Sequence, residues 1–166
     1  DGMFGPSRSM TRAEVSAIFA RLLAAKRGDA IPAAVGTKFV DIPSGAWYSG
    51  YVKYLSDYGV AYGRTKDRFA PNEAITRAEF VAMTVRFFDV YGDGSQEIME
   101  RYKDFNDVND GYWAAAYIKA AAKFGWVTGY TDGTFRGDSE INRAEVVTIV
   151  NRLLGREADA DYIADY

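Results

Sequence analysis

The sequence predicts a mainly α-helical protein built from tandem helix–loop–helix repeats. Three observations lead to this fold class: a segment that recurs about every 66 residues, a helix-start signature in each copy, and an apolar stripe at helical spacing after each start. Two helices of this length cannot enclose a core alone, so neighbouring repeats must share one. We therefore expect one domain of interlocking units.

The repeats divide the 166-residue chain unevenly. Residues 39–88 and 105–155 each read as a complete repeat, whereas 1–28 matches only the second half of one. Residues 156–166 form a tail, and the missing first helix of the first copy is expected either upstream of the chain or after its end. The positions that match between the complete repeats include Phe39 and Phe105, Asp41 and Asp107, Trp47 and Trp113, Gly63 and Gly129, and Phe69 and Phe135.

The first helix of each complete repeat is expected to start near Trp47 or Trp113. Apolar residues follow at a spacing of three to four, which is typical of one buried helix face. Gly59 and Gly125 come after this stripe and are predicted to end the two helices in the left-handed conformation.

The second helix has a clearer start in all three copies. A good N-cap residue stands three positions before a Glu, which together predict a capping box. The pairs are Thr11 with Glu14, Thr76 with Glu79, and Asn142 with Glu145. Turn-rich loops at 63–69 and 129–135 separate the first helix from the second, and Gly28 and Gly155 lie just past the last apolar positions.

Composition excludes many functions. The chain has no Cys and no His, so thiol, imidazole and His-ligated zinc chemistry are absent. A net charge of −3 gives no broad positive field for nucleic acid, and no apolar run is long enough for a membrane-spanning helix. No acidic cluster fits a calcium loop, so we expect no metal, no cofactor and no enzymatic activity.

The most informative candidate residues are Arg12, Arg77 and Arg143, each directly after an N-cap. A cation at this position opposes the helix dipole by about 0.3–1 kcal/mol, so its repetition suggests a compensating role. One interpretation is an anion site formed with the open amides of the helix start. The alternative is an ion pair with Asp41, Asp107 or a linker acid. The capping Glu residues are explained by capping alone.

The two tryptophans of the repeat also have two interpretations. Trp47 and Trp113 are expected to be core anchors first, with one edge exposed in a groove beside the Arg, where the ring could stack on a sugar. Trp126 has Val60 at its matching position and is expected only to pack.

The combined pattern resembles the S-layer homology (SLH) domain family. It consists of Phe-x-Asp, a Trp six residues later, two Gly residues, and Ile-Thr-Arg-Ala-Glu or Ile-Asn-Arg-Ala-Glu, and it covers residues 1 to about 155. The resemblance implies three repeats around a pseudo-threefold axis. It also implies an extracellular module that anchors bacterial surface proteins to cell-wall polysaccharide without a covalent bond.

The resemblance further implies where a ligand binds. In this family the ligand, often a pyruvylated secondary cell-wall polymer, lies in grooves between repeats. Arg12, Arg77 and Arg143 would then meet its carboxylate, while Gly63 and Gly129 would let the backbone approach it. The residues that would shape the sugar pocket are Asp41, Asp107, Trp47 and Trp113.

Other functions stay open at this level. The repeats could form a protein–protein or self-assembly module, with self-association through the missing half-repeat. They could instead recognise polyamine-modified peptidoglycan, if the grooves around Asp41 and Asp107 are acidic and the Arg residues are paired. An appended enzyme would lie outside these residues.

Overall fold

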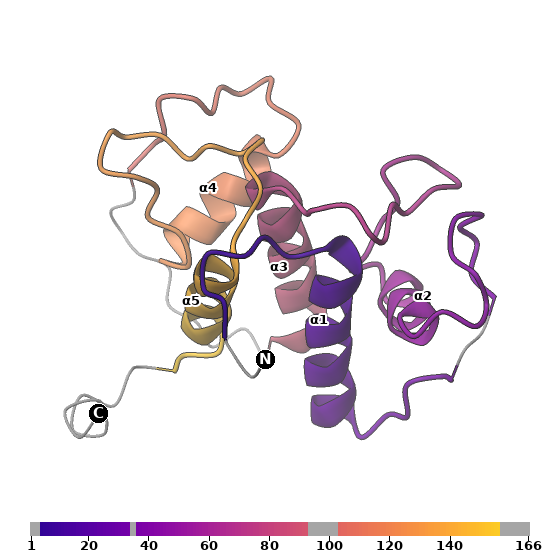
Figure 1. Ribbon diagram of the computed structural model, residues 1–166. Helices are drawn as coiled ribbons and strands as arrows, with labels where there is room; N and C mark the ends of the chain where they lie inside the picture. Colours follow the sequence, from indigo (N-terminus) through magenta and orange to yellow (C-terminus); the bar gives the residue numbers. More distant parts are fainter. Residues whose placement is uncertain (1–3, 34–35, 93–102, 157–166) are drawn as a thin grey trace.

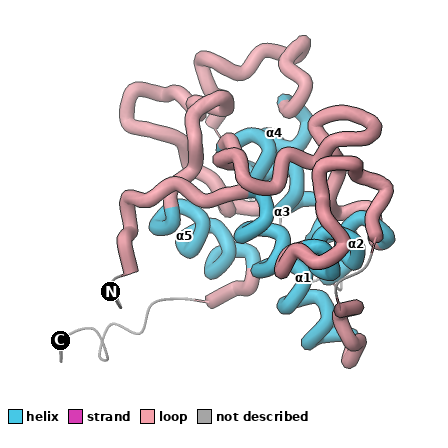
Figure 2. Tube along the Cα trace, turned by 45° about the vertical axis from the view of Figure 1, so that its right-hand side comes forward, coloured by secondary structure: helices cyan, strands magenta, loops and turns pink. Residues whose placement is uncertain are grey.

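The structure, a computed structural model, describes residues 4–33, 36–92 and 103–156. It confirms a mainly α fold, and the described residues contain helices and isolated bridges but no strand (Figure 2). The helices are α1 (Arg12–Arg27), α2 (Ser49–Asp57), α3 (Arg77–Tyr91), α4 (Ala115–Lys123) and α5 (Arg143–Leu153). Of the expected tail, residues 156–166, all but the first residue lie outside the described residues. None of the described helices is long and apolar enough to span a bilayer.

The predicted capping boxes are present at the start of α1, α3 and α5. In each, the N-cap side chain accepts from the Glu backbone N–H, and the Glu side chain accepts from the N-cap N–H. The left-handed conformation predicted for Gly59 and Gly125 is confirmed, with φ of 71° at both. Gly28 and Gly155, just past the ends of α1 and α5, have the same conformation, with φ of 72° and 62°. The local chemistry of the sequence therefore sets where these helices begin and end.

The residues that precede the three capping boxes join the copies in a ring of backbone hydrogen bonds. Met10 donates to the Ile141 carbonyl (3.2 Å), Ile75 donates to Met10 (2.9 Å), and Ile141 donates to Ile75 (3.1 Å). These residues occupy matching positions in the three copies, so each copy is tied to both others. The predicted pseudo-threefold arrangement of the complete repeats remains a prediction.

The helices pack across repeats. In Figure 1, α2 lies outside α1 and α4 lies beside α3, and α1 and α3 also contact each other. Phe19 of α1 packs against Phe80 and Phe87 of α3, with ring centroids 5.6 and 4.8 Å apart. The first helix of one repeat thus covers the second helix of the preceding repeat. Among the described helices, α5 has no such cover.

Candidate functional site

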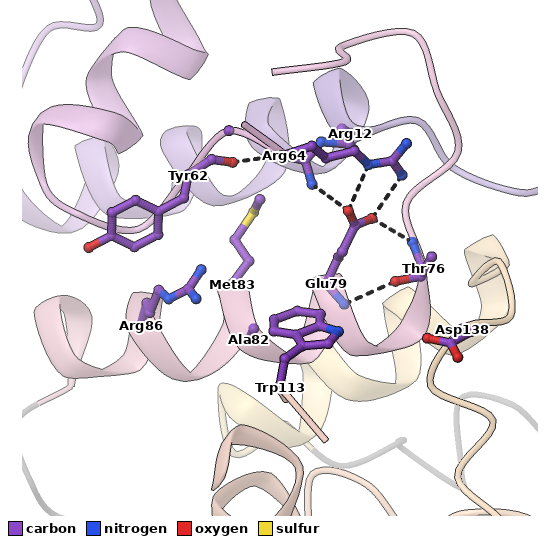
Figure 3. Close-up of a pocket in the computed structure, with 11 residues that line it drawn as sticks. Arg12, Tyr62, Arg64, Thr76, Glu79, Ala82, Met83, Arg86, Trp113 and Asp138 are labelled. Atoms are coloured by element: carbon purple, nitrogen blue, oxygen red, sulfur yellow. Dashed lines mark hydrogen bonds and ion pairs between the residues drawn. The ribbon is translucent and has the colours of Figure 1, made fainter. Parts of the chain in front are cut away.

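A groove of about 570 Å³, which we call the first groove, lies at the start of α3. Arg12 comes from the first half-repeat, and the loop at Tyr62, Gly63 and Arg64 comes from the second copy. The start and inner face of α3 supply Thr76, Glu79, Ala82, Met83 and Arg86, and the third copy adds Trp113 and Asp138 (Figure 3). Three copies therefore meet around one groove.

Arg12 is held on every side of its guanidinium. Nε donates to the Phe69 carbonyl (2.7 Å), Nη2 donates to the Tyr62 carbonyl (2.6 Å), and Nη1 lies 3.2 Å from Oε1 of Glu79. Its side chain is only 4% exposed. Burial lowers the pKa of Arg12, and the Glu79 charge partly offsets this effect. The residue therefore fastens the first half-repeat to the second copy.

Glu79 does more than cap α3. Besides Arg12 and its own capping bonds, its carboxylate accepts from Arg64 Nε (2.8 Å) and Nη2 (3.1 Å) (Figure 3). Burial alone would raise the pKa of Glu79, but the Arg64 hydrogen bond, the Thr76 N–H and the Arg12 charge outweigh it and hold the pKa below its ordinary value. The interpretation that capping explains this Glu completely is therefore wrong.

The helix starts offer no open amides of the predicted kind. The Arg12 and Ala13 N–H groups donate to the carbonyls of Glu73 and Pro71 (3.0 and 2.9 Å). Matching bonds close the start of α3, from Arg77 to Ser139 and Ala78 to Gly137, and of α5, from Arg143 to Arg8 and Ala144 to Pro6. The predicted anion site on free amides is wrong, because the neighbouring loop already occupies them.

A second groove, of about 240 Å³, lies between the second and third copies. Arg77 repeats two of the contacts of Arg12: Nε donates to the Phe135 carbonyl (2.9 Å) and Nη1 donates to Glu145 (2.8 Å). Tyr130 stands where the first groove has Arg64, and its hydroxyl donates to Glu145 (2.7 Å). The remaining lining includes Gly129, Thr148, Ile149 and Arg152.

Arg143 differs from the other two arginines. It lines neither groove, its guanidinium lies 5.0 Å from the Phe4 ring, and it forms no ion pair with any described carboxylate.

Asp41 and Asp107 brace loops instead of lining a groove. Asp41 accepts from the Phe69 and Ala70 N–H groups (2.9 and 2.7 Å), and Asp107 accepts from Phe135 and Arg136 (2.7 Å each). These bonds stabilise Ala70 and Arg136 at positive φ, which is rare for residues other than glycine. The predicted alternative pairing of the repeated Arg residues with these Asp residues is therefore wrong; Arg12 and Arg77 pair with the capping Glu of the next copy.

Gly63 and Gly129 line the first and second groove respectively. Packing supplies the reason for a glycine: an added Cβ would lie 2.7 Å from the Phe39 ring at Gly63 and 2.4 Å from the Phe105 ring at Gly129. Each loop thus sits directly on an aromatic ring of its own repeat.

The predictions for the three tryptophans have different outcomes. Trp126 is fully buried, as expected, but Trp47 and Trp113 are 60% and 56% exposed, so their predicted role as core anchors is wrong. Both lie just before a helix, not on its buried face, since α2 begins at Ser49 and α4 at Ala115. Trp113 lines the first groove, whereas Trp47 lines neither groove.

Sequence reasoning missed Arg86. Its guanidinium lies between the rings of Tyr62 and Tyr117, at 4.5 and 4.6 Å from their centroids. A signal was present, because Arg21 and Arg152 occupy the matching positions of the other two copies, nine residues after the repeated Arg. Among the described residues, no group of acidic side chains could hold a metal ion.

Comparison with known proteins shows what the chain is similar to. The family model for the S-layer homology domain matches residues 38–81 and 104–147. A cellulosome-anchoring protein of Acetivibrio thermocellus is 36% identical over 157 residues, which cover 93% of this chain and 34% of that protein. Cell surface glycoprotein 1 of the same organism is 34% identical over 94% of this chain, and the match covers 7% of that protein.

An enzyme also shares the similarity. An amylopullulanase of Thermoanaerobacterium thermosulfurigenes is 29% identical over 96% of this chain, and the match covers 8% of the enzyme. The chain thus spans about a third or less of the length of these three relatives.

Proposed function

The chain belongs to the S-layer homology domain family, and we propose that it anchors a bacterial surface protein to the cell wall without a covalent bond. The ligand is an anionic secondary cell-wall polysaccharide, of the pyruvylated class, bound in the grooves between repeats. In this proposal the chain is extracellular and associated with the wall or surface layer. The relatives named as cellulosome-anchoring and cell surface proteins support this location.

The observation that carries the proposal is the first groove. Residues from three copies line this groove, and the Trp113 ring is exposed in it. Tyr62 presents a second exposed ring. Flat apolar rings stack on the apolar face of a sugar, while arginines and Asp138 supply polar contacts. A groove of this size fits a short stretch of polysaccharide.

In this proposal the repeated arginines contribute to binding through the structure of the grooves. Arg12 and Arg77 hold the groove walls together through Glu79 and Glu145, so they shape the surface that the polymer contacts. The chain itself is proposed to be non-catalytic. The similarity to an amylopullulanase fits this, since the match covers only a small part of that enzyme.

Co-sedimentation with purified sacculi tests the proposal. We expect the chain to sediment with sacculi of A. thermocellus and to lose this binding after hydrofluoric acid extracts the secondary polymer. Trp113→Ala is expected to bind less while its unfolding curve is unchanged, because the ring is largely exposed. Equal binding to extracted and intact sacculi would contradict the proposal and favour peptidoglycan as the ligand.

Self-association is the second candidate, and α5 is the observation that favours it. Val147 is 43% exposed, although the matching residues Ser16 of α1 and Val81 of α3 are buried beneath the next repeat. Concentration-dependent association in analytical ultracentrifugation, abolished by Val147→Asp, would support this function. A monomer at all concentrations would contradict it.

A further inference from the structure

We propose that Arg86, and not Arg12, supplies the positive charge that meets the carboxylate of the polymer in the first groove. The inference rests on the proposed function and names the residue that selects an anionic ligand. It follows from how the charges of the first groove are already paired.

Two of the arginines in the first groove are neutralised by the protein. Arg12 pairs with Glu79, and Arg64 pairs with both Glu79 and Glu73. Each nitrogen of the Arg12 guanidinium already has a partner. The Arg12 side chain is only 4% exposed, and a ligand carboxylate that paired with it would compete with Glu79, whose carboxylate also forms the capping box of α3.

Arg86 is the arginine of the first groove with no carboxylate partner among the described residues. Its Nε and Nη2 donate to the Tyr117 hydroxyl, at 3.1 Å each, and neither Nη1 hydrogen has a described acceptor. The rings of Tyr62 and Tyr117 hold the guanidinium from two sides. Because it is already ordered, binding an anion costs it little conformational entropy.

Arg86 also lies where it can act together with the aromatic surface. Figure 3 shows Arg86 and Tyr62 toward one end of the groove and Asp138 toward the other, with Trp113 between them. A sugar ring stacked on Trp113 could therefore carry a carboxylate to Arg86. The ligand class that fits is a saccharide with an acidic substituent.

The matching arginines do not have the same setting. Arg152 lines the second groove, where it donates to the Trp126 carbonyl (3.3 Å), but no described tyrosine ring lies over it. Arg21 donates to the Tyr51 hydroxyl (3.0 Å) in the same way as Arg86 does to Tyr117, but it lines neither groove. Arg21 is therefore a matched control.

Calorimetric titration in a two-by-two design tests the inference. The full chain and its Arg86→Gln variant are each titrated with the polymer released by hydrofluoric acid, and with the same polymer after its carboxylates are amidated. We expect Arg86→Gln to bind the native polymer about 10- to 100-fold more weakly, the usual effect of losing a hydrogen bond to a charged group. Both proteins should bind the amidated polymer equally weakly. The arginine and the carboxylate are the two partners of one contact, so removing the second partner after the first has no further effect.

The controls separate this inference from the proposed function. Arg21→Gln should bind the native polymer as the unchanged chain does. Because each variant loses its contacts with a tyrosine, both should unfold at slightly lower urea concentrations than the chain and keep its circular dichroism spectrum. If the chain binds the native polymer and Arg86→Gln binds it equally well, this inference is overturned and the proposed function stands. If the chain does not bind the native polymer at all, both are overturned.

Discussion

The two grooves of the protein are built from the same pair of residues but end as different surfaces. In each, an arginine after an N-cap donates to the backbone of the next copy and pairs with its capping Glu, Arg12 with Glu79 and Arg77 with Glu145. The first groove gains a third wall from Trp113 and Asp138 and encloses about 570 Å³. The second has no corresponding wall among the described residues and encloses about 240 Å³.

The difference between the two grooves separates two roles of the repeat, joining copies and binding a ligand. The arginine–glutamate pair joins two copies and needs residues from those two alone. The binding surface needs a third copy to supply the exposed ring. The pairing therefore occurs in both grooves, while the capacity to bind is expected to depend on the third copy.

The largest effect is expected from removing the first pair. Arg12→Met should lower the free energy of unfolding by about 3–5 kcal/mol, because it leaves the carbonyls of Phe69 and Tyr62 without their donor and removes one of the two arginines that compensate the Glu79 charge. Arg77→Met should lower the free energy of unfolding by less, because Arg77 donates to one backbone carbonyl whereas Arg12 donates to two. Urea unfolding followed by circular dichroism measures both. A larger loss for Arg77→Met would contradict the comparison.

The next effect concerns pH and Glu79. Because its pKa in the folded protein lies below its ordinary value of 4.5, Glu79 binds protons less readily when folded. The stability it adds is fully present above 4.5 and is lost as the pH falls through the lower, folded pKa. Glu79→Gln should thus cost about 2 kcal/mol at pH 7, and the difference from the unchanged chain should narrow below pH 4.5.

Urea titrations at several pH values measure this difference. A gap between the two proteins that is as large at pH 3 as at pH 7 would show that the Glu79 charge is not the source of the stability.

A smaller effect is expected from the exposed ring of the first groove. Trp113→Ala should weaken binding of the released polymer about tenfold, as for an aromatic contact at the centre of a binding surface. Trp47→Ala, an equally exposed tryptophan outside both grooves, should retain more of the binding. Titration calorimetry compares them, and an equal loss in the two variants would remove the distinction between the grooves and the remaining surface.

The smallest effect is expected in the second groove. Arg152→Gln should weaken polymer binding about twofold or less, because this arginine is exposed and lacks the tyrosine clamp of Arg86. A loss as large as that of Arg86→Gln, measured in the same titration, would show that both grooves bind equally.

Local features of the fold could be predicted from the sequence, and tertiary partners could not. The capping boxes at Thr11, Thr76 and Asn142 depend on residues three positions apart, so their chemistry is visible in the chain. The partner of Arg12 is Glu79, a whole repeat away, and nothing in the spacing distinguishes it from Asp41. The amides of the helix starts looked open because the loop that closes them comes from another copy.

The site was predicted in part for the same reason. Arg12, Gly63 and Trp113 do line the first groove, yet Trp113 is exposed because it precedes α4 and does not lie on its inner face. Asp41 and Asp107 repeat for a reason of folding, to hold two loops with a residue at positive φ. Arg86 repeats as well, but its setting depends on Tyr62 and Tyr117, which lie more than 20 residues away in the sequence.

The three tryptophans allow the most direct test of the central claim, that the polymer binds in the first groove. Trp113 lies in the first groove, Trp126 is buried beside the second, and Trp47 lies outside both. In a nuclear magnetic resonance titration with the released polymer, each indole N–H gives its own signal. The account predicts that the Trp113 signal shifts first and furthest, whereas a shift of Trp47 with Trp113 unchanged would contradict it.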